Sequence, residues 1–167
     1  MLYSIQVVAV TALLAGCTRQ FAITVNEKSV YDPRLPENAR QVSDPDLQGC
    51  INLALRQSGV TDPANLTVLS CAAAQVEDLR GIAQLASLRF LDLTRNAITD
   101  LQPLASLPRL SGLSLADNAI TDISPLLAIN SLTAVVLSGN TQIPCSQLDR
   151  LEQRLGHNLT RPASCQD

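Results

Sequence analysis

Apolar and polar positions repeat along residues 66–143 at a constant spacing of 22 residues. Four segments align in register: LSCAAAQVEDL, FLDLTRNAITDL, GLSLADNAITDI and AVVLSGNTQI. One apolar column contains Leu69, Leu91, Leu113 and Val135, and a second contains Cys71, Leu93, Leu115 and Leu137. A fixed period of about 20–29 residues is typical of a solenoid, in which each unit covers the apolar side of the next.

The two middle copies show the pattern LxxLxLxxNxIxDIxPL in full. This pattern resembles the 22-residue class of leucine-rich repeats found in internalins and related bacterial proteins. The resemblance covers residues 66–143, which is nearly half of the chain. It implies an α/β fold, a short leucine-rich repeat solenoid with a parallel sheet on the concave face. We expect a helix to cap each end.

Three asparagines form a further column, at Asn96, Asn118 and Asn140, and Ala74 stands where the first repeat would have a fourth. An inward amide at the turn after each strand can satisfy backbone groups that would otherwise be buried without partners. We therefore predict a structural asparagine ladder. The missing member in the first repeat is typical of a terminal unit.

Three aspartates follow the same spacing, at Asp78, Asp100 and Asp122. Each precedes the convex segment of its repeat, so the column predicts caps for short helical turns. A calcium site would need several converging oxygens, and the motif offers one carboxylate per repeat. We expect no metal and no cofactor.

The first 16 residues are interpreted as a lipoprotein signal peptide. Residues 5–15 are apolar except for Gln6 and Thr11, and they are too few to favour a membrane-spanning helix. The quartet Leu14-Ala15-Gly16-Cys17 resembles the bacterial lipobox, which implies that Cys17 is lipidated. One departure is that no Lys or Arg precedes Arg19, whereas signal peptides normally carry a basic start. The competing interpretation is a buried apolar segment that ends in an unmodified cysteine.

Residues 17–43 would follow as the lipidated N-terminus and tether. Thr18, which stands where an aspartate would favour inner-membrane retention in lipoproteins of Gram-negative bacteria, implies the outer membrane by resemblance. Several acyl chains anchor a protein stably, whereas a single chain is marginal. Residues 21–31 alternate as in a β-hairpin, and an extended tether explains them equally well.

Helical caps are predicted on both sides of the repeats, within residues 44–65 and 144–167. Asp44 and Pro45 are typical of a helix start, and Gly59 of a helix end. In the C-terminal region, Ser146 and Asp149 have the spacing of a capping box. Apolar positions then recur at Leu148, Leu151 and Leu155 before Gly156.

The remaining four cysteines are Cys50, Cys71, Cys145 and Cys165. Four cysteines allow three pairings, and the local one, Cys50–Cys71 with Cys145–Cys165, would fix each cap to its end of the solenoid. Loops of this size contribute about 3 kcal/mol each in the chain-entropy account. Two disulfides would agree with an exported protein. Zinc is disfavoured because the chain contains no CxxC and no HxxxH.

Composition narrows the function classes. The twelve basic residues are scattered among fifteen acids, and aromatic residues make up 2% of the chain, so we expect no nucleic acid partner. The single histidine, His157, has no nearby acid–base partners in sequence, and no nucleophile–base set or phosphate-binding glycine loop is evident. The sequence therefore predicts that the chain is not an enzyme.

The resemblance implies that a partner binds the concave face. Side chains alternate along a strand, so twelve residues between the inward leucines should face outward. They are Val68, Ser70, Ala72, Phe90, Asp92, Thr94, Gly112, Ser114, Ala116, Ala134, Val136 and Ser138. The candidate binding residues are Val68, Ser70, Phe90, Asp92, Thr94, Ser114, Val136 and Ser138.

Phe90 is the only aromatic residue in the repeats, and Asp92 is the only charge among the twelve. Phe90 is either a partner anchor or an isolated exposed ring without a role. We expect a monomeric protein-protein interaction module with an unknown protein partner, held at the membrane through its lipid. The alternative is a structural or adhesive envelope protein without a specific soluble partner.

Overall fold

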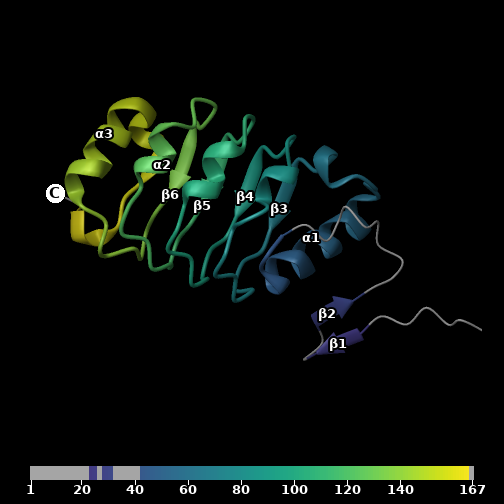
Figure 1. Cartoon of the computed structure of the whole chain (residues 1–167). Coiled ribbons are helices and arrows are strands. Elements are labelled where there is room, and N and C mark those ends of the chain that lie inside the picture. The colour runs from purple at the N-terminus through teal and green to yellow at the C-terminus, as the bar shows by residue number, and fades with distance from the viewer. Residues whose placement is uncertain (1–22, 26–27, 32–41, 166–167) are drawn as a thin grey trace, which may run out of the picture.

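The computed structural model describes residues 23–25, 28–31 and 42–165 (Figure 1). The predicted signal peptide, Cys17 and most of the predicted tether lie outside the described residues.

The repeats form a five-stranded sheet with the order β3-β4-β5-β6-β7, and every pairing in it is parallel (Figure 1). Its strands are β3 (Val68–Ser70), β4 (Phe90–Asp92), β5 (Gly112–Ser114), β6 (Ala134–Val136) and β7 (Leu159–Thr160). Leu69 pairs with Leu91, Leu91 with Leu113, and Leu113 with Val135. The period of the sequence is therefore the step from one strand to its paired neighbour.

The core is a stack of aliphatic side chains from successive repeats. Leu69, Leu91, Leu113 and Val135 are all at most 3% exposed, and the second apolar column, from Cys71 to Leu137, is at most 1% exposed. Burial of each such side chain contributes about 1.5–3 kcal/mol. No single repeat could bury these positions alone, because each row is covered by the rows above and below it.

Short helical segments return the chain on the side opposite the strands (Figure 1). They are η3 (Ile82–Gln84), η4 (Gln102–Ser106) and α2 (Ser124–Leu127). The Oδ1 atoms of Asp78, Asp100 and Asp122 each accept a hydrogen bond from the backbone N–H two residues later, at 2.8–2.9 Å. For Asp100 and Asp122 this N–H belongs to the first residue of the helical segment, which agrees with the predicted caps. Asp78 differs, because its donor Arg80 lies before η3, whose N-cap Gly81 has no side-chain cap.

The N-terminal cap is α1 (Pro45–Ser58), which is followed by the short segment η2 (Pro63–Asn65). As predicted, Asp44 caps this helix and Gly59 ends it in the left-handed conformation, at φ 71°. Leu47, Ile51 and Leu55 face the core. The open end of the first repeat is thereby covered.

The buried carboxylate of Asp44 joins the helix to the first repeat. Its Oδ1 accepts from the N–H groups of Asp46 and Leu47, and its Oδ2 accepts from those of Glu77 and Asp78 at 2.8 and 3.0 Å. Burial alone would raise the pKa of Asp44, but these four donors lower it below its ordinary value.

The C-terminal cap is α3 (Cys145–Leu155), followed by η5 (Gly156–Asn158) and, after β7, by η6 (Ala163–Cys165). The predicted capping box is wrong: the helix begins at Cys145 with Pro144 before it and has no side-chain cap. Asp149 instead pairs with Arg161 at 2.9 Å, and that guanidinium also binds Glu152 at 2.6 Å. The carboxylate of Asp149, which was expected to cap the helix start, therefore binds the tail that returns to the sheet.

An antiparallel hairpin lies before the cap, formed by β1 (Ile23–Val25) and β2 (Lys28–Tyr31). The hairpin interpretation of this region is therefore favoured over the extended tether. Strand β2 lies beside α1.

One of the two predicted disulfides is present in the described part of the chain, between Cys145 and Cys165, whose Cα atoms are 5.5 Å apart. Cys50 and Cys71 are present as thiols, which differs from the predicted bond. Their side chains nevertheless share a hydrogen bond, which together with burial raises the pKa of the Cys71 thiol. The two sulfurs are thus placed as neighbours, and the covalent link between them stays a prediction.

Candidate functional site: the exposed face of the sheet

Alternation along the strands divides their residues between the core and an exposed face. Each strand buries its central residue and turns its first and last residues outward, as the patterns of β3, β4, β5 and β6 show. Of the twelve residues predicted to face outward, Ala116 is the exception because it is buried at 9% exposure. The eight candidate binding residues are all exposed or half-buried.

The exposed face contains a shallow groove of about 380 Å³ that crosses four strands. Its lining includes six of the eight candidate residues, namely Val68, Ser70, Phe90, Asp92, Ser114 and Val136. Gly112 and Ala134 form a floor of small residues. Thr94 and Ser138 lie beyond the groove lining, on the turns that follow the strands.

Phe90 stands over this floor. A Cβ placed on Gly112 would lie 2.7 Å from Cδ1 of the Phe90 ring, which shows that the ring covers Gly112 closely. The ring is still 54% exposed. A side chain at position 112 would therefore displace the ring. The ring can lie here because Gly112 has no Cβ.

A second groove, of about 330 Å³, continues the surface from the sheet onto helix α1. It is lined by Cys50, Leu53, Ala54, Gln57, Ser58, Val68 and Ser70, so Val68 and Ser70 belong to both grooves. Leu53 is 55% exposed, as is Val68. Sequence reasoning missed Leu53, because the helix pattern only marks it as a residue away from the core.

The large hydrophobic side chains that stand exposed in the described part of the chain are Leu53, Val68 and Phe90. All three line the two connected grooves, and we call them the apolar strip. A single exposed apolar residue needs no explanation, whereas neighbouring ones mark an interaction surface. The site is therefore concentrated at the N-terminal half of the sheet and on its helical cap.

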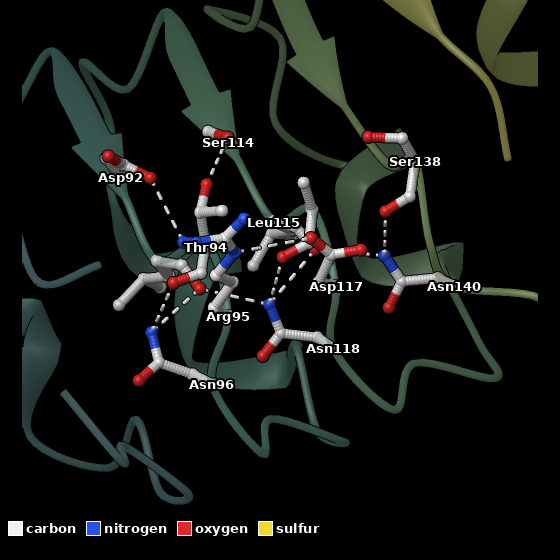
Figure 2. A network of polar contacts seen from close by, with 12 residues as sticks. Asp92, Thr94, Arg95, Asn96, Ser114, Leu115, Asp117, Asn118, Ser138 and Asn140 are labelled. Carbon is white, nitrogen blue, oxygen red and sulfur yellow. Dashed lines mark hydrogen bonds and ion pairs between the residues drawn. The ribbon is translucent and has the colours of Figure 1, made fainter. Parts of the chain in front are cut away.

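Polar groups border the strip at the ends of the strands (Figure 2). Asp92 Oδ1 accepts from the backbone N–H of Thr94 at 3.0 Å, and Asp92 Oδ2 accepts from the hydroxyl of Ser70 at 3.3 Å. The hydroxyls of Thr94 and Ser114 are 2.8 Å apart. Within the described residues, Asp92 has no ion pair with a basic side chain, whereas Asp117 lies 3.8 Å from Arg95.

The asparagine ladder lies beneath this border and supports it (Figure 2). Asn118 Nδ2 donates to the carbonyls of Leu93 and Leu115, both at 3.0 Å, and so joins two successive repeats. Asn96 and Asn140 make the equivalent pairs of bonds, and Asn140 is 1% exposed. These side chains are committed to the backbone and are not available to a partner.

A third hollow of about 500 Å³ adjoins Asp44, Asp46, Glu77 and Arg95. The Asp44 carboxylate in it is already occupied by four backbone donors. Across the residues that the structure describes, no group of three or more His, Cys, Asp or Glu side chains is arranged to hold a metal ion. The Asp44 side of the hollow therefore serves to join the cap to the first repeat.

His157, the single histidine, is exposed on η5 beyond the C-terminal helix. None of the helices in the described residues has the length and apolar content to cross a membrane.

The stacked parallel strands, the returning helical segments and the asparagine ladder together define a leucine-rich repeat solenoid. Solved structures with this fold include two internalins from Listeria monocytogenes. Internalin inlF is 31% identical, with a TM-score of 0.64 over 76% of this chain and 38% of the internalin. Internalin C2 is 28% identical, with a TM-score of 0.57 over 62% of this chain and 49% of the internalin.

This chain therefore spans less than half the length of either internalin. No protein-family model matches the sequence, and no curated protein matches it. The similarity establishes the repeat fold.

Proposed function

We propose that this chain is a non-catalytic protein-binding module held at the bacterial cell envelope by a lipid on Cys17. The observation that carries the binding proposal is the apolar strip, in which Leu53, Val68 and Phe90 are each more than half exposed along two connected grooves. Exposing such side chains to water is unfavourable, and a partner that covers them gains about 25 cal/mol for each Å² of apolar surface.

The rigidity of the site supports this proposal. Strand residues around the strip are fixed by parallel pairing and by the ladder beneath them, so a partner need not order a flexible loop on binding. An aromatic ring standing over small residues is also the side-chain type that dominates interface energies. The similarity to internalins supports an interaction role for the repeats.

The anchor proposal rests on the sequence around Cys17, since Leu14-Ala15-Gly16-Cys17 resembles a lipobox. Thr18 favours the outer membrane over the inner membrane by the same resemblance. Replacing Cys17 with serine tests the anchor. We expect the variant to lose incorporation of labelled palmitate and to move from the membrane fraction to the soluble fraction. Equal labelling of wild type and variant would contradict the lipid assignment.

Crosslinking in intact cells tests the binding role. We expect Phe90→Asp to remove the protein adducts formed by wild type, because it replaces the aromatic residue of the strip with a charge and hot-spot losses exceed about 2 kcal/mol. Ala105→Asp adds the same charge on η4, on the opposite side of the repeats, and should leave the adducts unchanged. An unchanged set of adducts in Phe90→Asp would favour the structural or adhesive alternative.

A further inference from the structure

We infer that the exposed face recognises a protein segment that carries an apolar side chain and a Lys or Arg side by side. The inference rests on the proposed binding function and specifies the chemistry of the partner. It starts from the position of Asp92, which lines the same groove as Val68 and Phe90.

The charge of Asp92 is uncompensated within the described residues. Its two hydrogen bonds come from neutral donors, the Ser70 hydroxyl and the Thr94 backbone N–H. The carboxylates of Asp78, Asp117 and Asp149 each lie beside an arginine, whereas Asp100, like Asp92, has no ion pair within the described residues. Asp92 is also the only charged residue among those that line the groove.

A carboxylate beside an apolar groove selects for a cation on the partner. An apolar or acidic group placed there would desolvate the charge without replacing its interaction with water. A Lys or Arg would form an ion pair at the edge of a buried apolar contact, where water is partly excluded and the attraction is stronger than on an open surface.

Strand geometry sets the spacing of the two partner groups. Phe90 and Asp92 are the first and last residues of β4 and face the same side, so they lie about 6.6–6.8 Å apart along the strand. An extended partner segment places residues i and i+2 on one side at the same separation. The expected motif is therefore an apolar residue and a basic residue two positions apart.

The lining of the groove leaves space for an apolar side chain beside the Phe90 ring. Its floor is Gly112 and Ala134, and the Phe90 ring and Val68 stand at its N-terminal side. Because the ring already covers Gly112, a single aliphatic or aromatic side chain of the partner can pack against the exposed side of the ring. The basic residue then lies toward the strand ends, where Asp92 and Ser114 are found (Figure 2).

Selection of random peptides displayed on phage against the immobilised full-length chain tests this inference. Wild type should enrich peptides with an apolar residue and a Lys or Arg two positions apart. Against Asp92→Asn the preference for the basic residue should disappear, and the apolar preference should remain. Asparagine keeps an oxygen that can accept from Thr94, so this variant removes the charge and preserves the turn.

A selected peptide should bind Asp92→Asn about fivefold more weakly than wild type, and added salt should reduce this difference. Asp100→Asn is the matched control. That aspartate also caps the N–H two residues later but lies on the side of the returning segments, so its replacement should not change binding. Phe90→Ala should weaken binding more than tenfold.

Three results would overturn the inference. They are an equal preference for basic residues on wild type and Asp92→Asn, no enriched peptides at all, and self-association in sedimentation that Phe90→Asp abolishes. The last result would show that a second copy covers the strip.

If Phe90→Ala weakens binding and Asp92→Asn does not, the chemistry inferred for the partner is wrong while the proposed function stands. If neither variant matters, the proposed binding face is itself wrong.

Discussion

The two ends of this solenoid are closed by different means. At the C-terminal end, a disulfide, a fifth strand and a helix complete the sheet and leave no large hydrophobic side chain exposed within the described residues. At the N-terminal end, buried apolar side chains, one buried carboxylate and a pair of neighbouring thiols join the helix to the repeats, and the surface beside it carries the apolar strip. The candidate site therefore includes the N-terminal cap and does not extend to the C-terminal cap.

Both caps supply side chains that replace a missing repeat. Asp44 accepts from two N–H groups of the first repeat, and Gln147 Oε1 accepts from the N–H of Ile123 in the third repeat at 2.8 Å. Arg154 donates to the carbonyls of Leu126 and Leu127, each at 3.0 Å. Backbone groups at the end of a stack have no neighbouring repeat, so a cap must satisfy them.

The largest expected effect is at the C-terminal end. Replacing Cys145 and Cys165 with serine opens a loop with a sequence separation of 20, which should lower the free energy of unfolding by about 3 kcal/mol. Urea denaturation of the variant and wild type measures this loss. The control is Cys50→Ala under the same conditions, which removes a cysteine that is present as a thiol and should cost less than about 1 kcal/mol. Equal stability of wild type and the double variant would show that the disulfide is not what holds this cap.

The next effect concerns Asp44. We expect Asp44→Ala to lower the free energy of unfolding by about 2–3 kcal/mol, because four backbone donors lose their acceptor and two of them belong to the first repeat. Asp62 is a matched control, since it also precedes a proline and caps a short helix, but it accepts only one bond, from Ala64. Asp62→Ala should cost about 0.5–1 kcal/mol. Similar losses in the two variants would mean that Asp44 acts only as a local helix cap.

The acid sensitivity of the N-terminal cap follows from the same residue. The folded protein holds the pKa of Asp44 below its ordinary value of 3.8, so the unfolded chain binds this proton more readily. The stabilisation is complete above the unfolded pKa and is lost as pH falls through the folded pKa. Unfolding measured in urea at a series of pH values should show the gap between wild type and Asp44→Asn narrowing below about pH 4. A gap that stays constant through this range would contradict the assignment.

Oxidation of the thiol pair would make the two ends more alike. We expect oxidised glutathione to link Cys50 to Cys71, because their side chains are already in contact. The link should add about 3 kcal/mol to the free energy of unfolding, since its loop is similar in length to that of Cys145–Cys165. Peptide mapping without reduction should identify the linked peptides, and thiol alkylation of the native protein serves as the control. A link from Cys50 to Cys145 would refute the pairing.

The smallest effect is at the last hydrogen bonds of the stack. Gln147→Ala removes the acceptor of the Ile123 N–H and should lower the free energy of unfolding by about 1 kcal/mol. Gln153→Ala, at an exposed position on the same helix, should be near neutral. Thermal unfolding of both variants distinguishes them. If the two losses are equal, Gln147 contributes only helix propensity.

Much of the fold could be predicted from the sequence because the repeats obey local rules. Columns at a constant spacing specify which side chains are buried, which strands pair and which asparagines form the ladder. The start and end of α1 were also readable, from Asp44 and Gly59. The candidate site was readable in part, since alternation identified Val68 and Phe90 as exposed.

Other features depend on contacts between distant parts of the chain. Strand β7 was missed because Leu159, which pairs with Val135 on β6, does not continue the constant step that leads from Leu113 to Val135. The capping box failed because Asp149 binds Arg161 from the returning tail instead. Leu53 could be recognised as part of the candidate site only from the tertiary structure, which places it in the same groove as Val68.

The sequence by itself determined the stack of repeats. Successive repeats share the same pattern, so their constant spacing specifies which side chains are buried and which strands pair. It also determined the alternation that turns Phe90 outward. The tertiary structure alone decided how the stack ends: Asp44 reaches Glu77 across 33 residues, and the ring of Phe90 lies over Gly112 of the next strand. Such contacts follow no period, since each joins a unique segment to the repeats and is fixed only when the whole chain is packed.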